Sequence, residues 1–414
     1  MWKYHCKTHF CLVGVAFLLG VALMAFTFDA SLEVYTEFFN QEFVDFLVSN
    51  PVLTYIMGGM SFAGIANACL LLQYIMRKFA FGPFILLALL VLAPDAILSV
   101  GAIMVIPSLI VSLIGWILLH RETARNLKEA GYADDKAMFD AYISKYSLDE
   151  SVKDMAEMCR KNTMKMSGIY ALGIVAVITV MAFVNNLIVL VVAFFFYSFA
   201  FNLLMRYRAS CTIPITALLY NECDPQKCIS GIYYFSNYKR RFKIANYTLF
   251  AQCLIYLNEP ELAKAVLIPY QKKDAASMLS YLSVMAYIDY MLKDDDALNA
   301  VSNSASKLRL NYGRTGVYIQ SEEMAAIQNK IQLMNGELHT CKKYYLQALQ
   351  KAKFPFQQVD ACYYIAMISF VEEDYVIAEM YFNKVISMGN KMAFVEKANH
   401  YLSKIKELNI QEAE

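Results

Sequence analysis

Two groups of cysteine and histidine residues come nearest to metal or redox chemistry. The first group comprises His5, Cys6, His9 and Cys11, and the second is the pair Cys223 and Cys228. Zinc ligands usually come as two spaced pairs, and no second pair accompanies the N-terminal group. A redox pair has two intervening residues, whereas here there are four, and Asp224-Pro225 between them is typical of a helix start. We therefore expect no metal and no cofactor.

Signatures of other catalytic chemistry are also missing from the sequence. The chain has no glycine-rich phosphate loop and no nucleophile elbow, and its remaining histidines, His120, His339 and His400, are isolated. A formal net charge of +1 argues against nucleic acid as a partner. We expect a protein that is not an enzyme.

Asp95, Asn67 and Asn202 lie inside long apolar stretches, where charged and amide groups are costly and often functional. Asp95 follows Pro94, so it lies either in the turn of a hairpin, which the Pro-Asp pair favours, or in a buried ion or proton site. Asn67 and Asn202 lie in two other stretches. For both, we expect interhelical hydrogen bonding rather than substrate binding.

The apolar stretches themselves predict transmembrane helices. The chain is 58% hydrophobic and only 18% charged, and a spanning helix needs roughly 20 mostly apolar residues. Six spans are predicted within residues 1–208, near 10–28, 52–76, 81–98, 101–119, 168–184 and 187–205. Small residues in Ala16-x-x-x-Gly20 and Gly59-x-x-x-Ala63 would let two of these helices approach closely.

Charge near the helix ends predicts the orientation. The loop Asp29–Asn50 carries five acidic residues and no lysine or arginine, whereas every basic flank of the six predicted spans falls on the opposite side. The positive-inside rule then places both termini in the cytoplasm. We expect a multi-pass protein of the cell membrane, most simply a bacterial inner membrane.

A charged insert, residues 121–166, interrupts the apolar half. Met138, Phe139 and Tyr142 recur at helical spacing, which predicts short amphipathic helices on the cytoplasmic side. They could lie on the membrane, dock on the C-terminal half, or form a solvated connector. A second connector, residues 209–237, precedes a basic run of Lys239, Arg240, Arg241 and Lys243, which is either a patch for anionic lipid or a solvated helix face.

The C-terminal half, residues 238–414, shows a repeated break in its helical pattern. The four breaks are Tyr256–Ala263, Met291–Ala297, Leu333–Leu338 and Phe370–Ala378, each a short polar turn between two apolar helices. A spacing of about 35 to 42 residues is typical of stacked helix pairs.

These pairs resemble the tetratricopeptide-repeat family over about 170 residues, and the membrane half resembles no family. The best match lies in the fourth unit, at Ile365, Ala366, Tyr375, Ala378 and Phe382. The first unit matches at Ala251 and Ala263, and the third at Tyr345 and Ala348 with Cys341 in place of alanine. The second unit does not align without a shift. Met392–Leu408 would be the capping helix.

The resemblance implies a superhelix whose first helices line a groove for a peptide or protein segment. Transfer of the family's groove positions points to Gln252, Glu323, Lys330, Asp360 and Tyr363. The alternative is that these are ordinary surface residues of a scaffold that binds elsewhere. The chain lacks the full pattern of asparagines and lysines that clamps a carboxylate tail.

Taken together, the sequence predicts an all-α protein: a bundle of about six transmembrane helices followed by a cytoplasmic, tetratricopeptide-like α-solenoid. We expect a membrane-anchored scaffold or adaptor that binds a protein or peptide partner. The alternative is a transporter or channel component whose repeat domain is regulatory.

Overall fold

The computed structural model describes residues 2–26, 28, 40–78, 101, 103–183, 187–238, 241–310 and 313–411. The predicted span 81–98, with Asp95, lies outside these residues, as do Lys239 and Arg240. The described chain is all-α, apart from a hairpin of two-residue strands, β1 (Asn237–Tyr238) and β2 (Arg241–Phe242).

The chain forms two compact units. The N-terminal unit comprises Met1–Arg125, Gln271–Met278 and Arg309–Gln320. The repeat unit comprises Asn126–Tyr270, Leu279–Leu308 and Ser321–Glu414. This division does not follow the change in hydropathy near residue 208, because the helices of the fifth and sixth predicted spans belong to the repeat unit.

The described residues of the N-terminal unit form a short η1 (Trp2–Tyr4) and the α-helices α1 (Cys6–Phe26), α3 (Gln41–Ser49), α4 (Pro51–Lys78) and α7 (Val105–Glu129). Helices α1 and α4 pack through glycine. A Cβ added at Gly20 would lie 2.5 Å from the carbonyl oxygen of Gly58, and one at Gly59 would lie 2.8 Å from the ring of Phe17. The close approach predicted from the small residues is therefore confirmed.

Two helices of the described chain, α1 and α7, are long and apolar enough to cross a membrane. Helices α3 and α4 add a third candidate if they are counted as one span, bent by 109° at the break between them. Helix α3 occupies part of the acidic segment that the sequence analysis treated as a loop. Asn40 accounts for its start, because its side chain accepts a hydrogen bond from the Phe43 amide.

The charged insert, most of which belongs to the repeat unit, packs on the first residues of the C-terminal half. It contains α8 (Asp135–Ile143) and η2 (Glu150–Val152), and then continues directly into α9 (Lys153–Phe183). Phe139 of α8 stacks on Phe250 with ring centroids 4.4 Å apart. The Asp135 carboxylate accepts hydrogen bonds from the Ile244 amide at 3.1 Å and from the Tyr247 hydroxyl at 2.7 Å. Of the three alternatives for this insert, docking on the C-terminal half is correct.

The predicted connector 209–237 is itself a helix pair, α11 (Ile213–Tyr220) and α12 (Pro225–Ser236), which follows α10 (Leu187–Ser210). Asp224 caps α12 as the sequence predicted, accepting a hydrogen bond from the Lys227 amide. Four further pairs and a last helix follow: α13 (Tyr247–Tyr256), α14 (Pro260–Leu267), α15 (Ala275–Leu292), α16 (Asp295–Ser306), α17 (Gly313–Met334), α18 (Leu338–Lys351), α19 (Pro355–Val371), α20 (Tyr375–Met388) and α21 (Ala393–Gln411).

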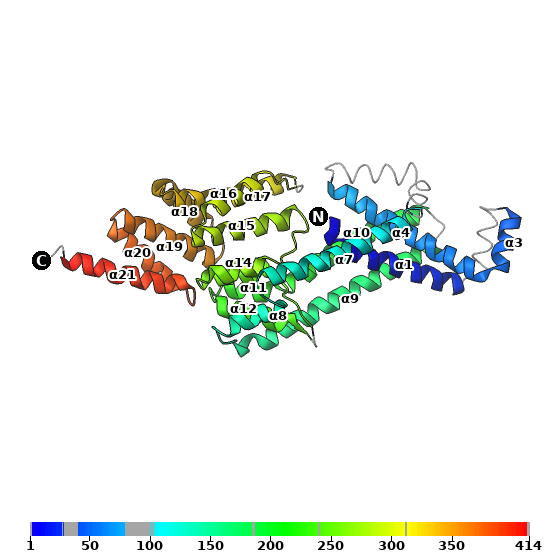
Figure 1. Ribbon diagram of the computed structural model, residues 1–414, viewed down its shortest axis with the longest axis horizontal. Helices are drawn as coiled ribbons and strands as arrows, with labels where there is room; N and C mark the ends of the chain where they lie inside the picture. The colour runs from blue at the N-terminus through cyan, green and yellow to red at the C-terminus, as the bar shows by residue number, and fades with distance from the viewer. Residues whose placement is uncertain are drawn as a thin grey trace. The chain divides into compact units, whose positions relative to one another are not determined.

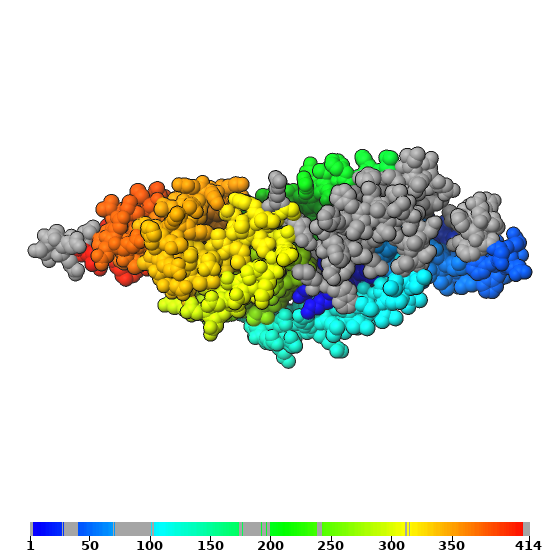
Figure 2. All heavy atoms as spheres, turned by 90° about the horizontal axis from the view of Figure 1, so that it is seen from above, coloured from blue at the N-terminus to red at the C-terminus, as the bar shows by residue number. Residues whose placement is uncertain are grey.

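From α18 to α21, each helix packs on the next in chain order (Figure 1). Seen from above, the helices from α17 to α20 follow one another from yellow to orange along one face of the repeat unit (Figure 2).

One turn geometry recurs in the four pairs from α13 to α20. Each first helix is followed, one or two residues past its end, by a residue with positive φ, which is Asn258 (62°), Lys293 (58°), Gly336 (74°) or Glu373 (62°). The next residue is always acidic, and its amide donates a 2.9 Å hydrogen bond to the carbonyl five residues earlier, as from Glu259 to Leu254 and from Asp374 to Ser369. This bond closes the end of the first helix. The second pair, which aligned poorly in sequence, has the same turn as the others.

Candidate partner-binding cavity

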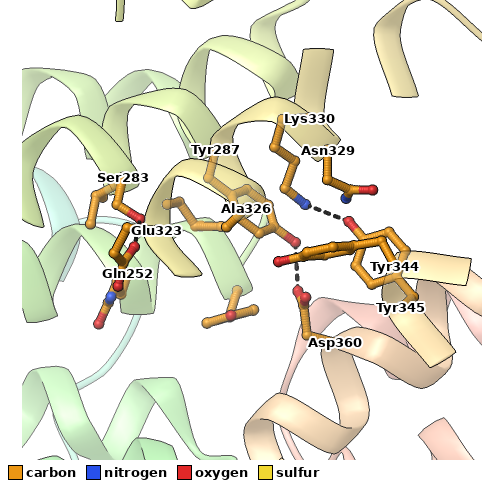
Figure 3. A pocket seen from close by; sticks show the side chains of 13 residues that line it. Gln252, Ser283, Tyr287, Glu323, Ala326, Asn329, Lys330, Tyr344, Tyr345 and Asp360 are labelled. Atoms are coloured by element: carbon orange, nitrogen blue, oxygen red, sulfur yellow. Dashed lines mark hydrogen bonds between the residues drawn. The ribbon is translucent and has the colours of Figure 1, made fainter. Parts of the chain in front are cut away.

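The first helices of these four pairs meet at a cavity of about 210 Å³. Helices α13, α15, α17 and α19 each contribute lining residues, and α18 adds two tyrosines (Figure 3). Polar and charged groups converge there with aromatic rings, the combination typical of a specific binding site. The cavity exists because the repeated turn returns each first helix to the same side of the array.

A buried lysine forms one end of the cavity. Lys330 is 6% exposed, and its ammonium lies 3.8 Å from the ring centre of Tyr287 and 4.0 Å from that of Tyr364. It also donates a 3.0 Å hydrogen bond to the hydroxyl of Tyr345. Burial lowers the pKa of Lys330 to about 8. The tyrosine faces and the hydroxyl partly replace the water that the ammonium has lost.

Asp360 accepts the last hydrogen bond in a chain of tyrosine hydroxyls. The Tyr364 hydroxyl donates to the Tyr287 hydroxyl at 2.9 Å, and Tyr287 donates to an Asp360 oxygen at 2.7 Å. Burial raises the pKa of Asp360, while the positive charge of Lys330 and the bond from Tyr287 oppose that rise. The chain fixes the direction of the carboxylate at the cavity wall.

A second carboxylate lies at the other end of the cavity. Glu323 accepts a short hydrogen bond from the Ser283 hydroxyl, and Gln252 lies next to both (Figure 3). Tyr344 lies between the two ends. Burial raises the pKa of its hydroxyl first, and the charges of Asp360 and Glu323, and of Glu322 outside the cavity, raise it further. Both carboxylates therefore act on the same part of the cavity.

Asn329 adds an unused amide to the cavity wall. It is 1% exposed, and neither its side-chain oxygen nor its nitrogen has a hydrogen-bond partner among the described residues. Such a group costs roughly 1–3 kcal/mol when left unpaired. An amide with both a donor and an acceptor available is suited to a ligand that offers the complementary pair.

Four of the five residues predicted for the groove line this cavity, namely Gln252, Glu323, Lys330 and Asp360. Tyr363 does not. It faces the core, 6% exposed, and its ring stacks on Phe394 at 4.2 Å. Ser283 and Tyr287 were not predicted, because they belong to the pair that did not align. Asn329 was not predicted either, since its only signal in the sequence is its place next to Lys330.

The polar residues predicted inside the apolar stretches have different surroundings. Asn67 is buried, donates a 2.9 Å hydrogen bond to the Gly101 carbonyl, and lies 2.9 Å from Nε2 of His9, whose Nδ1 is 2.8 Å from the Ser112 hydroxyl. Interhelical bonding is thus confirmed for Asn67, and His9 is used in that network. Asn202 is exposed on α10.

The predicted basic patch is described only in part. Arg241 lies in β2, and Lys243 follows it as an exposed side chain. The segment is therefore a hairpin, where the sequence analysis weighed a helix face, because Asn237 and Phe242 pair in an antiparallel register.

Comparison of the chain with protein-family models, with curated proteins and with solved structures found no match. The site therefore has to be interpreted from its own geometry.

Proposed function

We propose that this protein is a membrane-anchored adaptor whose C-terminal helical repeats bind a segment of a partner protein in the cavity between α13, α15, α17 and α19. The observation that carries this proposal is the convergence of all four first helices on one cavity lined by charged, amide and tyrosine side chains. A stacked helical array builds such surfaces as extended binding sites. The resemblance to the tetratricopeptide-repeat family favours the same interpretation.

The anchor is the apolar half of the chain. Helices α1 and α7 have the length and composition of membrane spans, and we propose six crossings in all, with both termini in the cytoplasm. The basic residues at the ends of the apolar segments support this orientation. The repeats would then receive their partner at the inner face of the membrane.

Site-specific photo-crosslinking tests this function. A photoreactive amino acid is placed at Gln252 in the full-length protein in its native membrane, and a matched variant carries it at Glu379, an exposed residue of α20. We expect irradiation to join one identifiable partner to the Gln252 variant and not to the Glu379 variant. Adducts from Glu379 alone, or from neither position, would contradict the proposal.

A further inference from the structure

We propose that the cavity binds a basic side chain, arginine or lysine, presented by an extended segment of the partner. This inference rests on the proposed function and specifies the chemistry of the ligand. The carboxylates Glu323 and Asp360 would hold the cation, while the Asn329 amide would bond the main chain beside it.

The charges of the cavity favour a cation. Two carboxylates and one ammonium line it, and the ammonium of Lys330 already faces the rings of Tyr287 and Tyr364 and bonds the hydroxyl of Tyr345. Glu323 and Asp360 thus leave an excess of negative charge around Tyr344. Charge-assisted hydrogen bonds from a guanidinium or ammonium group to buried carboxylates are among the stronger polar contacts.

The aromatic lining favours the same ligand. Tyr256, Tyr287 and Tyr344 all face the cavity, and tyrosine faces attract a desolvated cation. The same kind of contact already occurs at one end of the cavity, where the Lys330 ammonium lies over the rings of Tyr287 and Tyr364. Arginine combines a planar charge with an apolar stem, so it can contact both the rings and the carboxylates.

Other ligand classes fit poorly. An acidic segment would bring a third negative charge towards Glu323 and Asp360. An apolar segment would displace water from these carboxylates and from Asn329 without replacing its hydrogen bonds, which is unfavourable for every group left unpaired. Specificity for a basic segment would therefore come partly from rejection of the alternatives.

Selection from a random peptide library tests the inference. The probe is a displayed library of peptides with all positions random, offered to the full-length protein in nanodiscs, with the photoreactive residue at Gln252 retaining the peptides that reach the cavity. We expect arginine and lysine to be enriched at one position. Glu323→Gln and Asp360→Asn should each lower the affinity for the selected peptide about tenfold or more.

The matched control is Glu322→Gln, which removes the adjacent carboxylate. Glu322 is exposed and forms an ion pair with Lys351 at 3.0 Å, and it does not line the cavity. Because Glu322 acts on the cavity only from outside, through its charge near Tyr344, its substitution should change peptide affinity far less than Glu323→Gln does. A complementary measurement needs no protein variant, because replacing the enriched arginine of the peptide by glutamine should reduce binding by a similar factor.

The outcomes separate the inference from the function on which it rests. Peptides that crosslink at Gln252 without enrichment of basic residues, or whose affinity is unchanged in Glu323→Gln and Asp360→Asn, would overturn the inference and leave the proposed function standing. A library that yields no peptide crosslinked at Gln252 would overturn both.

Discussion

At the scale of single residues, Lys330 shows how this protein keeps a charge inside a helical array. Its ammonium is removed from water, and contacts with tyrosine rings and one hydroxyl replace part of the lost hydration. Compensation is incomplete, since burial lowers the pKa of the lysine to about 8. The charged form therefore costs stability in the folded protein at neutral pH.

Lys330→Met should test this cost through its pH dependence. Methionine has a similar volume and no charge, so we expect the variant to unfold at the same or a higher temperature near about pH 7.5. Above the folded-state pKa the wild-type lysine becomes neutral, whereas the unfolded chain keeps its proton up to about pH 10.4. Wild-type stability should thus rise relative to the variant as pH increases.

Thermal unfolding of both full-length proteins in detergent, followed by circular dichroism at about pH 7.5 and about pH 9.5, measures that difference. Comparison with the variant cancels the titration of tyrosines and cysteines common to both. A gap between the two transition temperatures that stays constant with pH would show that the Lys330 ammonium is not buried.

The cavity was only partly predictable from residues alone. Gln252, Glu323, Lys330 and Asp360 could be found because they occupy equivalent positions in neighbouring helices. The prediction that Tyr363 lines the groove was wrong. Tyr363 and Tyr364 are adjacent on one helix, and the stacking of Tyr363 on Phe394 is what turns its ring to the core. That contact joins two separate helices, and no local pattern encodes it.

At the scale of elements, the packing of α1 on α4 depends on the absence of side chains at a few positions. Gly20→Ala should lower the stability of the N-terminal unit by about 1–3 kcal/mol, because the new methyl group would meet the Gly58 backbone. Gly14→Ala is the matched control, since no atom lies within 4 Å of a Cβ at that position. Both substitutions raise helix propensity equally.

Thermal stability of the two glycine variants in the same detergent distinguishes them. The Gly20 variant should denature at a lower temperature than wild type, and the Gly14 variant should not. Equal transition temperatures for all three proteins would mean that α1 and α4 do not touch at Gly20.

The docked insert depends on one aromatic side chain. Phe139 is fully buried and stacks on Phe250, so Phe139→Ala should cost about 3–5 kcal/mol and release α8 from the repeat unit. Limited proteolysis should then cut the insert faster than in wild type. The control is Lys136→Ala, on the exposed side of the same helix, which should leave the cleavage rate unchanged. An unchanged cleavage rate in Phe139→Ala would contradict the packing of the insert.

Helices were more predictable than their boundaries and partners. The apolar run ends at Leu119, yet α7 continues to Glu129 because the residues that follow are good helix formers. The second pair was harder to align because Lys293 occupies a positive-φ position where glycine or asparagine would give a recognisable signal. Backbone hydrogen bonds, rather than residue type, make these turns equivalent.

At the scale of the whole molecule, the proposed function requires the repeats and the acidic segment before α4 to lie on opposite sides of a membrane. The positive-inside rule predicts this arrangement, in which the basic flanks would stay in the cytoplasm and the acidic segment, which has no lysine or arginine, would be translocated. Single cysteines at Ser49, exposed at the end of α3, and at Glu379, exposed on α20, should therefore react differently with a membrane-impermeant maleimide.

We expect intact cells to label Ser49→Cys, and Glu379→Cys to react only after the membrane is permeabilised. The parent protein, which carries neither new cysteine, gives the background from the natural thiols. Equal labelling of both positions from the outside would place the repeats away from the cytoplasm, and the cavity could then not receive a cytoplasmic partner.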